Sequence, residues 1–133
     1  MDPASDPLAW MRVMYGVAVL GAGVVGLVVL LAPRAAERYV FAGSAAVTPY
    51  LRILGALWLA LGAVAALGLS DPLTFSPVLL VQLAYKSLWL LAVAVPALLA
   101  GNREAGLVYM SGLFTAWVAA LLFAVPFGYL FGR

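Results

Sequence analysis

The chain has 133 residues, of which 67% are hydrophobic and 9% are charged. Soluble domains usually carry about 25% charged residues, so seven basic and five acidic side chains cannot cover a soluble domain of this length. The sequence has no cysteine and no histidine, which excludes disulfides, thiol chemistry and the commonest metal ligand and general base. The net charge of +2 is scattered along the chain, which excludes a nucleic-acid surface. Composition therefore predicts an integral membrane protein.

Four apolar runs are each long enough to cross a membrane, for which about 18 residues suffice. They cover residues 8–31, 49–69, 76–100 and 105–129. Pro33 ends the first run, Pro77 suits the start of the third, and Pro126 is expected to kink the end of the fourth. Only the connection 34–48 is long, and its residues 35–41 predict a short interfacial helix. Because the other loops are short, we expect one all-α domain, an antiparallel four-helix transmembrane bundle.

Charge near the ends of the spans predicts the orientation. The residues before the first span are acidic and the span is long, so we expect a retained helix rather than a cleaved signal peptide. One side carries four arginines: Arg34, Arg38, Arg52 and Arg103. The other side carries two arginines and three aspartates: Arg12, Arg133, Asp2, Asp6 and Asp71. The positive-inside rule therefore places both termini outside the cell.

Glycines recur with the same spacing in the first two spans. Each span has two glycines and a following proline at matching intervals: Gly16, Gly23 and Pro33, then Gly55, Gly62 and Pro72. Glycines seven residues apart share one helix face, and small residues let membrane helices approach closely. The match favours either an internal repeat or a chance likeness of apolar segments. In both cases these four glycines are predicted helix–helix contacts.

Lys86 is the residue that most needs an explanation. It lies about ten residues into the third span, roughly 15 Å along a helix, near the middle of a ~30 Å hydrocarbon core. Ionisable groups at such depth are costly and usually functional. We expect Lys86 to face the bundle interior, a hydrated cavity or a partner, or to sit there uncharged.

Further polar and aromatic residues are predicted near Lys86. Helical spacing places Gln82, Tyr85 and Trp89 on its face. Depth matching across the other spans adds five more: Arg12, Tyr15, Trp58, Thr115 and Trp117. Together they predict a polar ligand-binding pocket with aromatic walls. The competing interpretation is that Lys86 only supports packing, through backbone carbonyls or cation–π contacts.

The spans contain no aspartate or glutamate, which argues against a proton pump. It also argues against a retinal Schiff base at Lys86, which needs a carboxylate counter-ion. Ser87 and Ser111 have no histidine to activate them. We therefore expect no catalytic residue, no metal and no cofactor. A buried cation without an acidic neighbour instead suits an anionic or carbonyl-bearing ligand, or an acidic residue on another chain.

Three stretches carry a resemblance: GAGVVGL at 21–27, YLRILGAL at 50–57 and YKSLWL at 85–90. They resemble the small four-helix bacterial membrane proteins of the DoxX-like type. The resemblance covers the first three spans and implies a four-helix bundle in a bacterial inner membrane. Some members of that group are accessory subunits of redox systems. The thiol chemistry sometimes linked to the group is excluded, because this chain lacks cysteine.

Two functions from different classes stay open. The first is a non-catalytic membrane protein that binds a lipophilic molecule, such as a quinone, fatty acid or lipid, near Lys86. The second is a structural or accessory subunit that joins a larger membrane complex, or forms a homo-oligomer, through its glycine faces. A small transporter is a third option, and four helices would require it to act as a dimer.

Overall fold

The structure, a computed structural model, describes residues 6–43 and 45–132, apart from the side chain of Pro7, and this part of the chain is all-helical. Four helical stretches are long and apolar enough to cross a membrane: Leu8–Leu31, Pro49–Gly68, Pro77–Leu99 and Ala105–Ala124. They confirm the four predicted apolar helices. Asp2 and Arg133, which entered the predicted charge balance, lie outside the described residues.

Shorter segments make up the long stretches, and two of the segments are π-helical turns. In chain order they are α1 (Pro7–Ala18), η2 (Val19–Val24), α2 (Val25–Leu31), α3 (Pro33–Tyr39), α4 (Pro49–Gly68), α5 (Pro77–Trp89), η3 (Leu90–Ala94), α6 (Val95–Leu99), α7 (Ala105–Ala124) and α8 (Phe127–Phe131). The segment α3 occupies the connection in which a short helix was expected.

Local sequence explains where the helices begin and end. The side chain of Asp6 accepts a hydrogen bond from the Leu8 N–H at 3.0 Å, and Thr48 caps α4 in the same way. Helix α7 ends at Ala124 rather than at the predicted limit, residue 129. Val125 is extended there, with ψ of 122°, because a residue before proline avoids the helical region. Pro126 thus ends the helix instead of kinking it.

The two π-helical turns were not predicted. The turn η3 directly precedes α6, whose second residue is Pro96. Proline lacks an N–H donor and its ring crowds the carbonyl group one turn earlier, so a wider turn accommodates it. The turn η2 contains Gly21 and Gly23, which face neighbouring helices closely. Each wide turn therefore lies where the backbone must accommodate a nearby group, which is the Pro96 ring at η3 and a neighbouring helix at η2.

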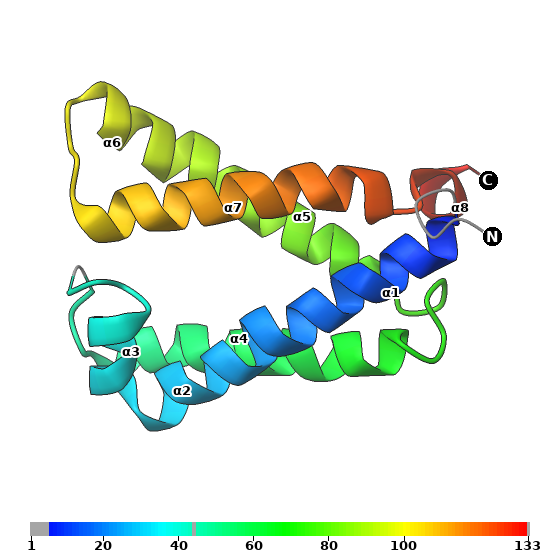
Figure 1. Ribbon diagram of the computed structural model, residues 1–133, viewed down its shortest axis with the longest axis horizontal. Helices are drawn as coiled ribbons and strands as arrows, with labels where there is room; N and C mark the ends of the chain where they lie inside the picture. The colour runs from blue at the N-terminus through cyan, green and yellow to red at the C-terminus, as the bar shows by residue number, and fades with distance from the viewer. Residues whose placement is uncertain (1–5, 44, 133) are drawn as a thin grey trace.

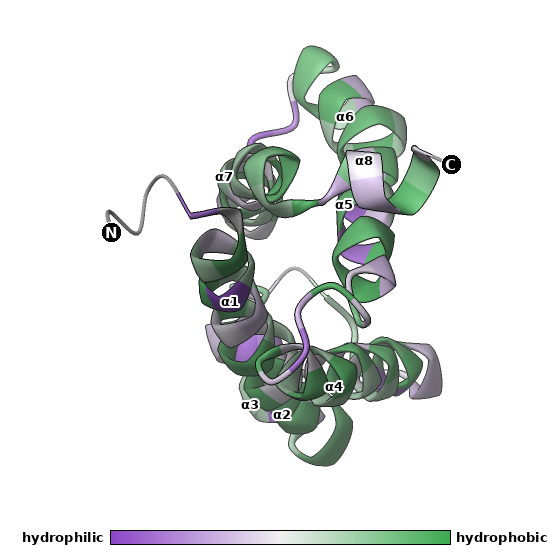
Figure 2. Ribbon diagram, turned by 90° about the vertical axis from the view of Figure 1, so that its right-hand side faces the viewer, coloured by the Kyte–Doolittle hydropathy of each residue, from purple (hydrophilic) through white to green (hydrophobic). Residues whose placement is uncertain are grey.

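The helices form two groups. The α1–η2–α2 stretch packs on α4, and α5 packs on α7, while α1 also contacts α7. Figure 1 shows the two groups close together where α1 meets α7 and diverging toward α3 and α6. The termini and the α4–α5 connection lie at one end, and α3 with the α6–α7 connection lies at the other (Figure 1). Viewed along the long axis, both groups are mainly hydrophobic (Figure 2).

Glycines allow the first helical stretch to approach α4. A Cβ atom on Gly62 would overlap the Cα atom of Gly23, and one on Gly55 would lie 2.9 Å from the Gly26 carbonyl oxygen. Gly26 is thus a contact glycine that the spacing argument missed. Gly16 differs from its predicted role, because nothing lies within 4 Å of a Cβ built there. Gly16 and Gly55 occupy equivalent positions in the spacing pattern, but only Gly55 contacts another helix.

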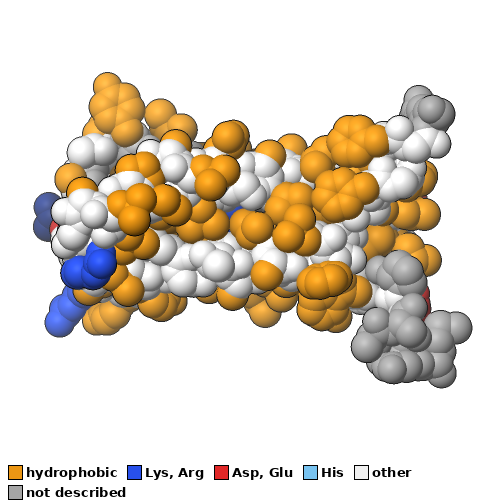
Figure 3. Space-filling view, turned by 90° about the horizontal axis from the view of Figure 1, so that it is seen from above, with side chains coloured by type: hydrophobic (Ala, Val, Ile, Leu, Met, Phe, Trp, Pro, Cys, Tyr) orange, Lys and Arg blue, Asp and Glu red, His pale blue; other side chains and the backbone are white. Residues whose placement is uncertain are grey.

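The outer surface of the helices is apolar along most of its length. Leu20 is 68% exposed, Leu99 83% and Phe123 81%, and many other large hydrophobic side chains face outward. Figure 3 shows hydrophobic side chains along the length of one face, with basic side chains gathered at one end. This end carries α3 and the α6–α7 connection, which contain or adjoin the four arginines 34, 38, 52 and 103.

Candidate functional site

Lys86 lies in the last turn of α5, near the middle of the long stretch Pro77–Leu99. Its side chain is 1% exposed, which is exceptional for a lysine because burial of a charge is costly. It is turned toward the inside of the molecule, as predicted from its depth in the span. Such a position requires partners that replace the lost hydration.

The partners of the Lys86 ammonium are mainly aromatic. The Nζ atom donates a hydrogen bond of 2.6 Å to the Tyr85 hydroxyl oxygen. It also lies 4.3 Å from the centre of the Tyr85 ring, 5.1 Å from that of Phe114 and 4.1 Å from that of Trp117. Cation–π contacts of this kind stabilise a desolvated cation by about 2 kcal/mol or more. Three aromatic faces therefore hold the ammonium between α5 and α7.

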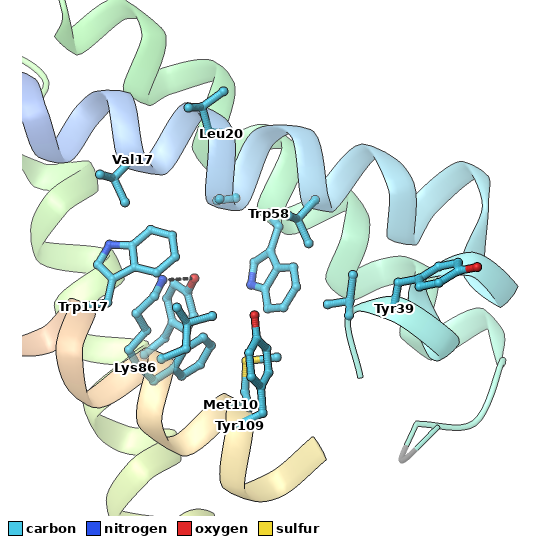
Figure 4. Close-up of a pocket in the computed structure, with 15 residues that line it drawn as sticks. Val17, Leu20, Tyr39, Trp58, Lys86, Tyr109, Met110 and Trp117 are labelled. Carbon is cyan, nitrogen blue, oxygen red and sulfur yellow. Dashed lines mark hydrogen bonds between the residues drawn. The ribbon is translucent and has the colours of Figure 1, made fainter. Parts of the chain in front are cut away.

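A cavity of about 520 Å³ adjoins this ammonium. Its size falls in the range of pockets that hold small organic ligands. Figure 4 shows Lys86 and Trp117 at one side of it, Trp58 opposite them, and Tyr109 with Met110 below. The cavity therefore lies between the two helix groups, with aromatic walls contributed by both.

The cavity has buried donors on Lys86 and Trp58, and its side-chain acceptors are the hydroxyl groups of Tyr39, Tyr85 and Tyr109. Lys86 contributes an ammonium group, and Tyr85 contributes a hydroxyl whose oxygen already accepts from it. The Trp58 indole N–H is buried near the Tyr85 hydroxyl, but no described residue accepts a hydrogen bond of good geometry from it. No carboxylate is found among the described residues that line the cavity. The buried Lys86 cation therefore has no counter-ion among the described residues of the cavity wall.

A second cavity of about 380 Å³ lies against the first. Four residues line both: Trp58, Tyr85, Met110 and Phe114. Trp89 lines only the second, with its ring centre 5.4 Å from that of Phe114 in an edge-to-face arrangement. Glu104 is the carboxylate on the wall of the second cavity. The two cavities therefore share a wall that is made mainly of aromatic side chains.

Four of the predicted pocket residues meet in the first cavity: Trp58, Tyr85, Lys86 and Trp117. Gln82 lies one helical turn before Lys86 and is fully buried, but it lines neither cavity. Both polar atoms of its amide are without a hydrogen-bond partner among the described residues. The helical spacing that placed it on the Lys86 face was sound, but the cavity stops short of it.

Three other predicted pocket residues lie outside both cavities: Arg12, Tyr15 and Thr115. Arg12 is turned outward and donates to the Leu69 carbonyl oxygen at 3.2 Å. The Tyr15 hydroxyl donates to the Pro72 carbonyl oxygen at 2.6 Å, and Thr115 donates to the Ser111 carbonyl oxygen within α7. Depth matching did not bring them together with Lys86, because depth along a helix says nothing about the direction of the side chain.

Sequence reasoning also missed residues that line the first cavity. Tyr109, Met110 and Phe114 all come from α7, together with the predicted Trp117. Their spacing is helical, so the one predicted member could have led to the others. Val17 and Leu20 of the first stretch complete the opposite wall, and as common apolar residues they carried no signal.

No cluster of histidine, cysteine, aspartate and glutamate side chains in the described part could hold a metal ion. Comparison of the chain with protein-family models, with curated proteins and with solved structures finds no match. The argument for function therefore depends on the residues of the site alone.

Proposed function

We propose that this chain is a multi-pass membrane protein, an antiparallel four-helix bundle in a bacterial inner membrane. The outward-facing apolar side chains support a membrane setting, because lipid rather than water is the solvent they suit. The arginines at the end that carries α3 support a cytoplasmic position for this end. The termini, at the other end, are then outside the cell.

Within this bundle, the cavity beside Lys86 binds a lipophilic molecule with an anionic or carbonyl head group. The observation that carries this proposal is a buried ammonium group on the cavity wall with no acidic side chain among the described lining residues to balance its charge. A head group that brings acceptor oxygens would pair the Lys86 ammonium and the Trp58 N–H. The aromatic and aliphatic walls suit the apolar part of the same molecule.

The glycines add a specific argument against the accessory-subunit alternative. Gly23, Gly55 and Gly62 were candidate surfaces for association with another chain. In the structure all three are covered by helix contacts within this chain. A binding function thus explains more of the observed geometry than a docking function through these glycines.

Thermal unfolding of the purified protein in mild detergent tests the ligand proposal. Three probes are compared: oleate with an anionic head, methyl oleate with a neutral carbonyl head, and an alkane of similar length without a head group. We expect oleate or methyl oleate to raise the unfolding midpoint, because a ligand that binds only the folded state stabilises it. The alkane is expected to have no such effect. Equal shifts with all three probes would contradict a role for the head group.

A further inference from the structure

The first cavity has a polar inner end and an apolar outer end. At the inner end, Lys86 is 1% exposed and Trp58 6% exposed. At the outer end, Leu20 of η2 is 68% exposed and Leu113 of α7 is 40% exposed. Helix α7 packs mainly on α1 and α5, while η2 and α2 pack on α4, so the cavity lies between elements of different helix groups. The cavity therefore leads from a buried cation to an apolar, outward-facing mouth.

Gly21 of η2 and Trp117 of α7, which both line this cavity, approach each other closely. A Cβ atom on Gly21 would lie 2.5 Å from the tip of the Trp117 indole ring, so glycine at this position lets the ring reach η2. The face of the same indole ring lies 4.1 Å from the Lys86 Nζ atom. Leu20 and Leu113, also on the wall of this cavity, contribute outward-facing hydrocarbon surface. A molecule that extends from Lys86 to Leu20 and Leu113 therefore meets a cation at one end and hydrocarbon at the other.

The charge of the cavity wall favours one kind of ligand head group over another. Lys86 is the charged residue on the wall of the first cavity, and no described residue there carries the opposite charge. A neutral carbonyl would accept a hydrogen bond but leave the cation without a counter-ion. A carboxylate supplies both the acceptor oxygens and the opposite charge, and burial of a balanced ion pair is less costly than burial of a lone cation.

We infer that the occupant is a single-chain carboxylate of the fatty-acid class. Its carboxylate lies at Lys86, and its hydrocarbon chain leaves the protein between η2 and α7. This inference rests on the proposed function and adds the class of head group and the direction of the chain. It also means that the ligand enters sideways from the surrounding lipid, because the mouth is bordered by outward-facing apolar side chains.

Fluorescence quenching by brominated stearic acids tests the direction. A Trp10→Phe/Trp89→Phe variant keeps only Trp58 and Trp117, which both line the first cavity. Three stearic acids are compared, with bromine atoms close to the carboxylate, at mid-chain or near the methyl end. We expect a graded loss of fluorescence that is largest for bromine close to the carboxylate. The methyl esters of the same acids, which lack the charge, are expected to quench only at higher concentration.

Each other result overturns a stated part of the inference. Strongest quenching by bromine near the methyl end would place the head at the mouth and overturn the direction. Equal quenching by acids and methyl esters would overturn the carboxylate while leaving the binding of a carbonyl lipophile intact. No quenching by any acid or ester would overturn the inference, and the failure of oleate and methyl oleate to stabilise the protein would separately overturn the proposed function.

Cross-linking of the mouth tests the route. The chain has no cysteine, so a Leu20→Cys/Leu113→Cys variant offers a bis-maleimide reagent only two sites. We expect the cross-linked protein to lose quenching by the carboxylate-proximal bromostearate, because the mouth is closed. A matched Leu54→Cys/Leu107→Cys variant bridges α4 and α7 at the second cavity and should keep the quenching. Unchanged quenching in the first variant, or equal loss in both, would contradict entry between η2 and α7.

Discussion

The Nζ atom of Lys86 lies 4.1 Å from the centre of the Trp117 ring, which joins α5 to α7 through a cation–π contact. The same ammonium faces Phe114 at 5.1 Å, so two aromatic residues of α7 hold a cation that belongs to α5. This arrangement could serve packing, ligand binding or both. The two roles differ in what happens when the charge is removed.

Replacement of Lys86 by methionine separates them. Lys86→Met keeps the length of the side chain and its contact with aromatic rings, since methionine sulfur also packs against them. Loss of a charge-assisted hydrogen bond should weaken oleate binding by about 1.5–3 kcal/mol, or roughly ten- to hundredfold. The unfolding midpoint without ligand should be unchanged or higher, because a buried cation is costly. Titration and thermal unfolding in detergent measure the two effects.

Lys86→Arg provides the matched control, because it preserves the charge. We expect it to retain more oleate affinity than Lys86→Met. A clear drop in the unfolding midpoint of Lys86→Met, both with and without oleate, would instead show that the ammonium serves packing.

The glycine contact between the first helical stretch and α4 predicts an asymmetric response to added methyl groups. Gly62→Ala should destabilise the fold by about 1–3 kcal/mol, because its Cβ would overlap the backbone of Gly23. Gly16→Ala is the control, with nothing within 4 Å of the new atom, and should be neutral or stabilising. Thermal midpoints of the two variants are compared with that of the parent. Equal losses would show that Gly16 has a contact of its own.

Replacement of Gln82 by leucine is expected to stabilise the fold. Its side chain is fully buried and both amide atoms lack a partner in the described part of the chain. Gln82→Leu should therefore raise the stability by about 1–3 kcal/mol, since it removes unpaired polar atoms from the interior. A lower midpoint would show that the amide is hydrogen-bonded to buried water or to a ligand. Gln82→Glu, of the same shape, should be destabilising because it buries a charge.

The hydrogen bond from Tyr15 to the Pro72 carbonyl ties the first helical stretch to the α4–α5 connection at 2.6 Å. Tyr15→Phe leaves that carbonyl unpaired in the interior and should cost about 1–3 kcal/mol. Tyr109→Phe, at a side chain that is 58% exposed, should have little effect on the unfolding midpoint. A similar loss for both variants would count against the stabilising role of the Tyr15 hydroxyl.

Orientation in the membrane can be measured with single cysteines, because the chain has none of its own. We expect Ser70→Cys, in the α4–α5 connection, to react with a membrane-impermeant maleimide on intact cells. Asn102→Cys, in the α6–α7 connection among the arginines, should react only after the membrane is opened. The reverse pattern would show that the termini are cytoplasmic.

Composition and hydropathy were sufficient to predict the number of long helices and most of their limits. Apolar runs of this length are typical of helices that are long enough to cross a membrane. Proline correctly indicated the end of the first helix and the start of the third, since it restricts the backbone both of its own residue and of the preceding one. The fourth helix was overestimated at its end, where Pro126 stops the helix rather than bending it. The buried position of Lys86 was also readable from the sequence, because it lies so far from either end of its span.

The environment of Lys86 was decided only by the tertiary structure. The sequence indicated which residues share a face of α5, but Phe114 and Trp117 reach the ammonium because α7 packs on α5 in one particular rotation. The same holds for the glycines, where Gly26 meets Gly55 and Gly16 meets nothing. Depth in a membrane is set by position along one helix, which a sequence contains. The direction of a side chain depends on how each helix is rotated against its neighbours, and this is determined by the packing of all of them together.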